Sequence, residues 1–366
     1  MAQETGKRKA DHIKICLEQK AQARKATSGF EDVQLIHRAL PEVDREKISL
    51  STSFLGKKLA APLIVGAMTG GTDEATEINA SIAEAVEKLG LGMGVGSQRA
   101  ALEDKKLEKT YQVARKKAPK AFLIANIGGV QLVHGYGLRE VKKAVEMINA
   151  DAVAIHLNGV QEMLQPEGQT NFKGILAKIS AIAGELDKPL IVKETGCGIS
   201  AEDAKALEAA GVKAIDVGGV GGTSFAAVEY YRAKNPNNIS DVFWDWGIPT
   251  AVSLIEATQT VKIPVIASGG VRNGLDIAKS LALNASLASI SQPVLEAAVK
   301  GAKKTEKVLS CLIDELRSVM FLVGAGNLDA LAKVPLVVGG KTAEWLNIRN
   351  FDTVNYAQRS TLTFEY

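Results

Sequence analysis

Short apolar segments that alternate with stretches of helical periodicity constrain the fold of this chain more than any other feature. The first apolar segment spans residues 63–68, and Ile78, Ile82 and Val86 recur behind it at helical spacing. Seven more apolar segments lie at residues 92–96, 122–125, 151–155, 190–192, 214–217, 265–267 and 287–291. Strands that are apolar throughout are typical of parallel sheets covered by helices. Eight successive strand–helix units predict an α/β fold, a (β/α)₈ TIM barrel, rather than a doubly wound open sheet.

The segments outside these units are expected to form an extension at each end of the barrel. Residues 1–60 are predicted to be an N-terminal arm and cover, with a helix over residues 10–23 and a hairpin or extended cover over residues 35–55. Arg8 and Lys9 stand just before the expected helix. The barrel is expected to occupy residues 61–350, closed by a long helical stretch over residues 295–322, and residues 351–366 are left as a C-terminal tail.

Composition and charge exclude several classes of protein. The 366 residues fit one elaborated α/β barrel, and a net charge of +3 is too small to indicate nucleic-acid binding. The three cysteines, Cys16, Cys197 and Cys311, are far apart, so neither a disulfide framework nor zinc-ligand spacing is present. We see no signal-peptide pattern and no apolar run long enough to cross a bilayer. We therefore expect a cytoplasmic protein that binds neither nucleic acid nor a membrane.

Polar side chains stand where the apolar segments end. The fourth segment runs into His156, Asn158, Gln161 and Glu162. One strand end of this kind is more often a set of ordinary solvated residues, but three other segments end in the same way, at Ser97, Asn126 and Lys193. Because the chemistry of a parallel barrel gathers at the carboxyl ends of its strands, these side chains are candidates for the rim of one site.

Glycine-rich turns follow the sixth and seventh segments, as GGVGGT at residues 218–223 and SGGVR at residues 268–272. In such barrels the loops after strands seven and eight commonly bind phosphate through backbone N–H groups, so the SGGVR turn and Ser291-Gln292 are candidates for that site. Lys193 is either a lysine that reaches into water or a cation beside an electron-rich ring such as a flavin. Glu162 has no metal-ligand pair near it, which disfavours zinc and leaves a surface glutamate or a Mg²⁺ ligand that works with a phosphate.

The ordered motifs of the chain resemble those of the type 2 isopentenyl-diphosphate isomerase family from about residue 7 to about residue 350. The motifs are RKADHI at 8–13, MTGG at 68–71, GSQR at 96–99, HLN at 156–158 with QE at 161–162 and QPEG at 165–168, VKETG at 192–196, GGTS at 221–224, WGIPT at 246–250 and SGGVR at 268–272. The arm motif and the HLN…QE segment are more specific than the glycine turns, which many flavin barrels share.

The resemblance implies an enzyme of isoprenoid biosynthesis that interconverts isopentenyl and dimethylallyl diphosphate. It implies reduced FMN and Mg²⁺ as cofactors, NADPH as reductant, and a homotetramer or homo-octamer. The residues implied for the diphosphate are Arg8, Lys9 and Arg99, those for the rest of the substrate are Asn158 and Gln161, and the metal ligand is Glu162. Catalytic roles fall on Gln161, Lys193 and His156. The implied FMN contacts are Ala67, Met68, Thr69, Ser97, Asn126, Lys193 and Thr223, with Gly270, Val271, Arg272, Ser291 and Gln292 around its phosphate.

Two departures from the usual flavin-barrel pattern concern the phosphate site. Asn284 stands where glycine is usual before the last strand, and Ser291-Gln292 replaces the usual Gly-Arg or Ala-Arg, which removes a possible cation. Two other classes of function stay open. One is an FMN oxidoreductase of the hydroxy-acid oxidase type that would use His156 as its base, and the other is a non-catalytic flavin-binding scaffold.

Overall fold

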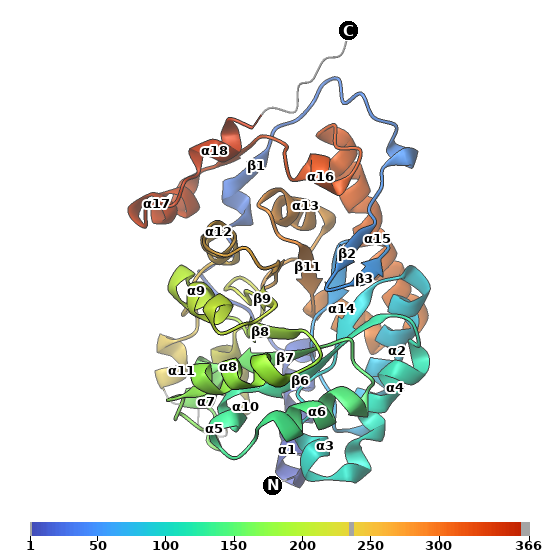
Figure 1. The fold of residues 1–366 in the computed structure, drawn as a ribbon, viewed down its shortest axis with the longest axis vertical. Coiled ribbons are helices and arrows are strands. Elements are labelled where there is room, and N and C mark those ends of the chain that lie inside the picture. Colours follow the sequence, from blue (N-terminus) through green and yellow to red (C-terminus); the bar gives the residue numbers. More distant parts are fainter. Residues whose placement is uncertain (1, 234–237, 360–366) are drawn as a thin grey trace.

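Eight parallel strands close into a barrel within residues 2–233 and 238–359, the part of the chain that the computed structural model describes. The strands follow one another around the barrel in chain order, and the last pairs with the first through Ile290 and Val65. They are β4 (Leu63–Val65), β5 (Gly92–Gly94), β6 (Phe122–Gly128), β7 (Ala152–Leu157), β8 (Leu190–Glu194), β9 (Ala214–Asp216), β10 (Val265–Ala267) and β11 (Leu287–Ile290). The predicted (β/α)₈ barrel is confirmed, and helices surround it in Figure 1.

The outer helices begin and end at local sequence signals. In α2 (Asp73–Leu89), the Thr72 hydroxyl accepts a hydrogen bond from the N–H of Ala75, and Gly90 ends the helix with a φ of 65°. The other outer helices of the barrel are α4 (Lys109–Lys117), α6 (Leu138–Met147), α8 (Ile175–Glu185), α9 (Ala201–Ala209), α12 (Thr250–Thr260) and α13 (Gly274–Ala282).

The helical stretch expected over residues 295–322 consists of two helices, α14 (Gln292–Ala298) and α15 (Ala302–Leu322). Gly301 is the N-cap of α15, with a φ of 100° that residues with side chains rarely adopt, so one continuous helix cannot run through it. Shorter helices lie in the connecting loops and near the C-terminus: α3 (Arg99–Glu103), α5 (Gly129–Val133), α7 (Gly159–Leu164), α10 (Phe225–Arg232), α11 (Asn238–Val242), α16 (Leu328–Leu331), α17 (Gly340–Ile348) and α18 (Val354–Ala357), with 3₁₀ turns at Phe30–Asp32, Arg45–Lys47 and Lys105–Leu107.

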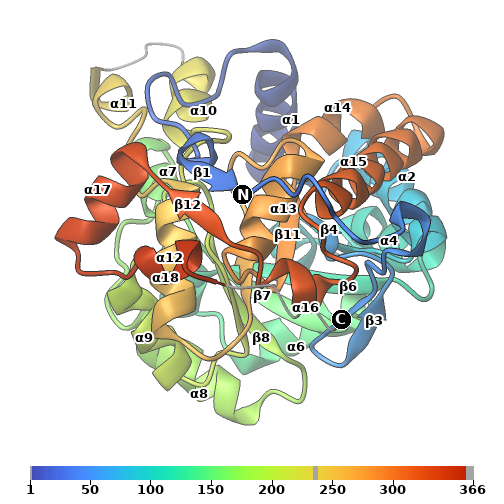
Figure 2. The same cartoon turned by 90° about the horizontal axis from the view of Figure 1, so that it is seen from above.

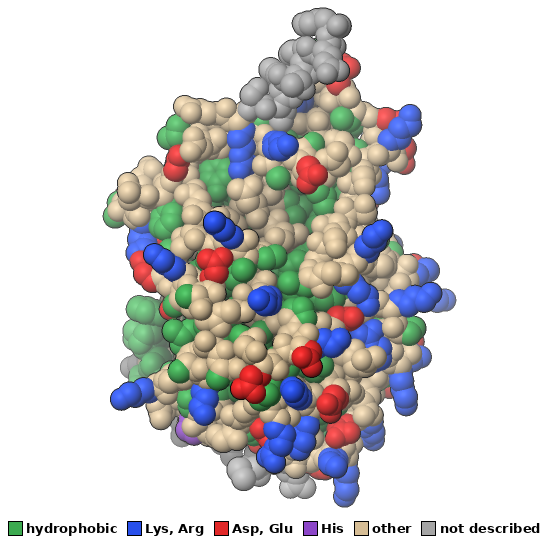
Figure 3. All heavy atoms as spheres, in the orientation of Figure 1, with side chains coloured by type: hydrophobic (Ala, Val, Ile, Leu, Met, Phe, Trp, Pro, Cys, Tyr) green, Lys and Arg blue, Asp and Glu red, His purple; other side chains and the backbone are tan. Residues whose placement is uncertain are grey.

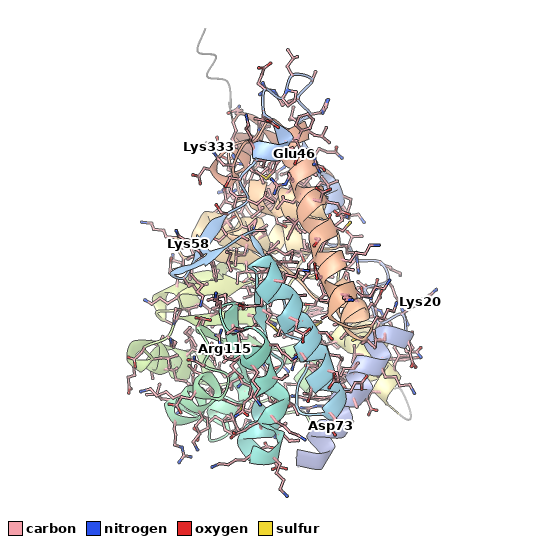
Figure 4. The ribbon with its side chains drawn as sticks, turned by 90° about the vertical axis from the view of Figure 1, so that its right-hand side faces the viewer. Lys20, Glu46, Lys58, Asp73, Arg115 and Lys333 are labelled. Atoms are coloured by element: carbon pink, nitrogen blue, oxygen red, sulfur yellow. The ribbon has the colours of Figure 1, made fainter. Side chains whose placement is uncertain are left out.

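A β-hairpin closes the amino-terminal end of the barrel. Two antiparallel strands form it, β2 (Thr52–Phe54) and β3 (Lys57–Leu59). Its Phe54 and Leu59 are buried with the side chains that begin the barrel strands, and the Phe54 ring packs edge-on against Phe122 at 5.7 Å between centroids. Figure 4 shows Lys58 of the hairpin and Lys20, just beyond α1 (Ala2–Glu18), on opposite sides of the molecule. The carboxyl end of the barrel is therefore left for a binding site.

The N-terminal helix, α1, differs from the prediction. It begins at Ala2 instead of residue 10, so Arg8 and Lys9 lie within it and do not precede it. Ile13 and Ile15 are buried, and Ile15 packs with Ala227 of α10 and with Trp244. Most helical stability in proteins comes from such packing, and composition alone therefore could not locate the first turns.

Segments from the two ends of the described chain pair with each other. β1 (Val33–Leu35) and β12 (Leu336–Val338) form an antiparallel pair in which Val33 lies opposite Val338, and they run side by side in Figure 2. Residues 360–366 of the predicted tail lie outside the described residues. No helix of the described ranges is long and apolar enough to span a membrane. Acidic and basic side chains are interspersed over the face shown in Figure 3, as the small net charge suggests.

Candidate active site

A cavity of about 220 Å³ opens at the carboxyl ends of the barrel strands, with α1 as its cover. The cover consists of Lys9, His12, Ile13 and Cys16. The predicted site residues that line the cavity are Lys9, Ala67, Met68, Thr69, Lys193, Thr223, Gly270, Val271, Arg272, Ser291 and Gln292. The structure thus brings most of the predicted FMN residues to one place.

Eight predicted site residues do not line this cavity in the described structure: Arg8, Ser97, Arg99, Asn126, His156, Asn158, Gln161 and Glu162. Arg99 is turned along its own helix, where its Nε donates to Glu103 Oε1 at 2.8 Å. Arg8 donates to Gln165 Oε1 at 3.3 Å and lies 3.6 Å from a carboxylate oxygen of Glu167. No contact joins Arg99 to Arg8 or Lys9 among the described interactions.

Glycines at the back of the cavity let two loops approach each other closely. Gly269 and Gly270 have φ values of 100° and 72°, which residues with side chains rarely adopt. A Cβ atom on Gly222 would lie 2.7 Å from the backbone nitrogen of Gly270. The loops after β9 and β10 can therefore meet only because no side chain stands between them.

Arg272 supplies a cation at this end of the cavity. Its Nη1 donates to Gln292 Oε1 at 3.3 Å, which places the guanidinium beside the N-terminal turn of α14. Arg272 is therefore a cation that the phosphate end retains, whereas Ser291-Gln292 adds none. An arginine beside backbone N–H groups is a common setting for a phosphate.

Two buried carboxylates that were not predicted from the sequence, Asp216 and Glu194, flank Lys193. Asp216 lies opposite Lys193 in the β8–β9 register and accepts a short hydrogen bond from the Ser268 hydroxyl. Burial raises the pKa of Asp216, although the charge of Lys193 opposes this shift. Glu194 accepts the N–H of Gly196 at 2.6 Å, and burial raises the pKa of Glu194 to about 7. A carboxylate at the end of an otherwise apolar strand was the signal that could have identified both residues.

The half-buried His156 and the buried Asn126 form a hydrogen-bonded pair that does not line the cavity. His156 Nδ1 lies 2.9 Å from Asn126 Oδ1, and because an amide oxygen only accepts, Nδ1 carries the hydrogen. Asn126 Nδ2 in turn donates to the carbonyl of Val95 at 3.1 Å. Burial, with a smaller contribution from the charge of Lys193, lowers the pKa of His156 to about 3, so the imidazole is neutral. His156 is therefore positioned to orient Asn126.

The ammonium of Lys9 points into the protein, although the residue as a whole is only half-buried. It donates to the carbonyl of Ser97 at 2.6 Å and contacts the hydroxyl of Tyr111 at 2.5 Å. No carboxylate pairs with it among the described residues. Burial, with a smaller effect of Arg8, lowers the pKa of Lys9 to about 7. Tyr111 was not foreseen, because in the sequence nothing distinguishes it from an ordinary buried aromatic residue of α4.

A second polar cluster surrounds Glu162 on α7. Asn158 Nδ2 lies 3.0 Å from Gln161 Oε1 and 3.1 Å from Glu162 Oε1, so two oxygens converge on one point. Asn158 Oδ1 is buried without a hydrogen-bond partner. No group of three or more His, Cys, Asp and Glu side chains in the described ranges could hold a metal ion. A metal in this cluster would therefore depend on one carboxylate, amide oxygens and a ligand.

Comparisons with known proteins place the chain in a family. The FMN-dependent dehydrogenase family matches residues 1–125 and 140–337. Over 362 residues the chain is 50% identical to an isopentenyl-diphosphate delta-isomerase of Methanosarcina barkeri, with 98% of each chain covered. Over 353 residues it is 49% identical to the protein of the same name from Methanothermobacter thermautotrophicus, with 96% of this chain and 99% of that one covered.

Among solved structures, a mandelate oxidase variant superposes with a TM-score of 0.62 and 18% identity, covering 93% of this chain and 98% of its own. At that identity the likeness shows the barrel fold alone. The sequence relatives are far closer and extend over almost the whole chain. The chain therefore belongs to the FMN-dependent dehydrogenase family and, within it, to the type 2 isopentenyl-diphosphate delta-isomerases.

Proposed function

We propose that this protein interconverts isopentenyl diphosphate and dimethylallyl diphosphate, with FMN in the barrel cavity and Mg²⁺ at Glu162. One observation carries the proposal: the Lys9 ammonium is buried at the cavity, and its hydrogen-bond partners among the described residues are uncharged. A buried cation with only neutral partners is costly, and an anionic ligand would offset that cost. The names of the relatives specify a diphosphate, which is such an anion.

The residues of the cavity suit FMN. The hydroxyl oxygen of Thr69 is buried without a hydrogen-bond partner, and the phosphate end combines a glycine turn with Arg272. We assign the phosphate to Gly270, Val271, Arg272, Ser291 and Gln292, and the ring to Ala67, Met68, Thr69, Lys193 and Thr223, with Ser97 and Asn126 behind them. Bound in reduced form, the flavin would supply an electron-rich ring with a nitrogen capable of proton exchange.

The chain itself supplies charge and a dry pocket. Moving the double bond requires a proton to be gained at one carbon and lost at another, and neither carbon is acidic. Ile13 and Cys16 of α1 cover the cavity, and burial raises the pKa of Cys16 to about 11, so its thiol stays neutral. Such a cover keeps water from the reacting carbons. We assign Lys193 to charge balance beside the ring, and we assign Gln161, which lies next to Glu162 outside the cavity lining, to the substrate.

Glu162 carries the carboxylate of the polar cluster on α7, and its two oxygens accept hydrogen bonds from Asn158 Nδ2 at 3.1 Å and from Gln165 Nε2 at 2.7 Å, donors that a small hard cation would replace. Mg²⁺ commonly binds through one or two carboxylates and completes its shell with waters and ligand phosphates. We therefore assign Mg²⁺ to Glu162, with the substrate diphosphate as a further ligand. NADPH is the reductant we assign to the flavin.

The test is an anaerobic assay in which the purified protein, loaded with FMN, receives isopentenyl diphosphate with and without reductant. We expect dimethylallyl diphosphate to form only after reduction and only with Mg²⁺, and to be abolished by a chelator. Oxidation of 2-hydroxy acids without any isomerisation would overturn the proposal. The position of His156 already argues against that chemistry, because its ring is tied to Asn126 and does not line the cavity.

A further inference from the structure

The buried amide of Gln165 connects the arm to the carboxylate of Glu162. Gln165 lies directly after α7 and is 5% exposed. Its Oε1 accepts a hydrogen bond from Arg8 Nη1 at 3.3 Å, and its Nε2 donates to Glu162 Oε2 at 2.7 Å. One side chain thus contacts both the cation proposed for the diphosphate and the carboxylate proposed for the metal.

The orientation of this amide follows from the chemistry of its two partners. A guanidinium can only donate and a carboxylate can only accept, so the amide oxygen must face Arg8 and the amide nitrogen must face Glu162. A glutamate at this position would oppose the charge of Glu162, and an apolar side chain would satisfy neither partner. A glutamine side chain satisfies both at once.

A ring of charged side chains also attaches α1 to the rest of the protein. Glu167 lies 3.6 Å from Arg8 and 3.0 Å from Arg232, and Arg232 donates to the buried Glu229 at 2.6 Å. Glu229 lies 3.0 Å from His12, which is one helical turn beyond Arg8 on α1. This ring attaches α1 to α10. Gln165 is not part of the ring and connects Arg8 to Glu162.

We propose that Gln165 is a positioning residue that couples the arm to the carboxylate site, so that a divalent cation at Glu162 strengthens the binding of a diphosphate group by Arg8. The inference rests on the proposed function. A cation that binds the oxygens of Glu162 competes with Gln165 Nε2 for Oε2. Once that bond is lost, the amide no longer holds its oxygen toward Arg8, and the guanidinium is free to bind the diphosphate. By linkage, a diphosphate on Arg8 strengthens cation binding by the same factor.

The experiment measures the dissociation constant of inorganic pyrophosphate for the FMN-loaded protein by calorimetry, with and without Mg²⁺. Mg²⁺ should increase the affinity for pyrophosphate by a certain factor in each protein, called the gain. We expect the gain of the wild type to be about fivefold or more larger than the gain of Gln165→Met, and fivefold is the lower end of typical allosteric couplings. Mg²⁺ also binds pyrophosphate in solution, but this is the same for every variant and cancels from the comparison.

The matched control is Glu167→Gln, which removes the ion pair of Arg8 and leaves the amide link intact. It should keep the wild-type gain. A gain in Gln165→Met equal to that of the wild type would overturn the inference. If Gln165→Met fails to fold, Gln165→Ala serves instead, because it also lacks the amide that contacts Arg8 and Glu162, and it too should lose the gain.

The isomerase assay separates this inference from the proposed function. If the wild type isomerises its substrate with Mg²⁺ but Gln165→Met shows the full wild-type gain, the proposed function stands and the coupling is wrong. If the wild type shows the coupling with pyrophosphate but no isomerisation, the coupling stands and the proposed function is wrong.

Discussion

The ammonium of Lys9 and the hydroxyl of Tyr111 lie 2.5 Å apart, although 102 residues separate them in the chain. Tyr111 also donates to the carbonyl of Ser97 at 2.7 Å, so lysine, tyrosine and carbonyl form a triangle beneath α1. The Tyr111 ring packs closely against Gly70, where an added Cβ atom would come within 2.1 Å of it. The ring is thus fixed by packing, and its hydroxyl fixes the position of Lys9.

Replacing Tyr111 by Phe should weaken substrate binding more than turnover. The change removes one hydrogen-bond partner of a charged group, an interaction worth about 1.5–3 kcal/mol, while the ring packing remains. We expect KM for isopentenyl diphosphate to rise by about tenfold or more, with a much smaller change in kcat and an unchanged flavin spectrum. Steady-state kinetics at saturating FMN checks this, and a KM equal to that of the wild type would count against it.

Replacing Lys9 by Met should reduce affinity without loss of stability. A charge-assisted hydrogen bond of about 1.5–3 kcal/mol corresponds to roughly one to two decades in the dissociation constant of pyrophosphate. The variant should unfold at the same temperature as the wild type or a higher one, because a buried ammonium without a carboxylate partner is costly. Calorimetry and thermal denaturation measure the two effects. A variant that unfolds early or loses FMN while binding pyrophosphate normally would show that Lys9 is structural.

The lowered pKa of Lys9 predicts how stability depends on pH. In the folded, ligand-free protein this pKa is about 7 instead of 10.5, so between those values the unfolded chain binds more protons than the folded one. The stability of the wild type relative to Lys9→Met should therefore rise with pH from about 7 to about 10 and level off below pH 7. Urea denaturation of both proteins across this range provides the measurement, and a difference independent of pH would contradict the assignment.

Replacing Gly222 by Ala should impair the phosphate end of the cavity. The new methyl group would meet the backbone nitrogen of Gly270 and push the two loops apart. We expect FMN affinity to fall by about tenfold or more, which is 1.4 kcal/mol. Gly184→Ala in α8 is the control, because nothing lies within 4 Å of its added Cβ atom. Equal retention of FMN by the two variants on dialysis would refute this role for Gly222.

Replacing Glu162 by Gln should abolish the response to Mg²⁺ and leave FMN in place. Glu162 accepts hydrogen bonds from Asn158, Gln165 and the N–H of Gln169, and a neutral amide removes the charge that attracts the cation. We expect most of the activity to be lost, and the flavin absorbance to be retained because Glu162 does not line the cavity. Activity and Mg²⁺ dependence like those of the wild type would place the metal elsewhere.

The barrel and the strand-end loops were predictable because burial on both faces leaves a direct trace in the sequence. The glycine turn after β10 and the polar ends of β5, β6 and β8 could be located because each directly follows such an apolar strand. Asn284 was noted where glycine is usual, and its φ of 70° confirms that the backbone there is left-handed, which asparagine tolerates better than most residues.

The arm and its surroundings were harder to predict, because long-range contacts decide them. Nothing local indicates that Lys9 turns inward, since its partners Ser97 and Tyr111 belong to other parts of the chain. The role of Gln165 could not be predicted for the same reason, because it depends on Arg8 of α1, which is not a neighbour in sequence.

The pairing of β1 with β12, in which Val33 lies opposite Val338, can form only after nearly the whole chain has been synthesised. About 300 residues must leave the ribosome before β1 can find its partner, and contacts so distant in sequence form slowly. Each barrel strand between them pairs with the strands that precede and follow it in the chain, apart from β11 and β4, which close the barrel. We infer that β1 waits unpaired while the barrel assembles and that its pairing with β12 is among the last steps of folding. Until then an unpaired strand edge is exposed, so a nascent chain that stalls before Leu336 should be especially prone to aggregation.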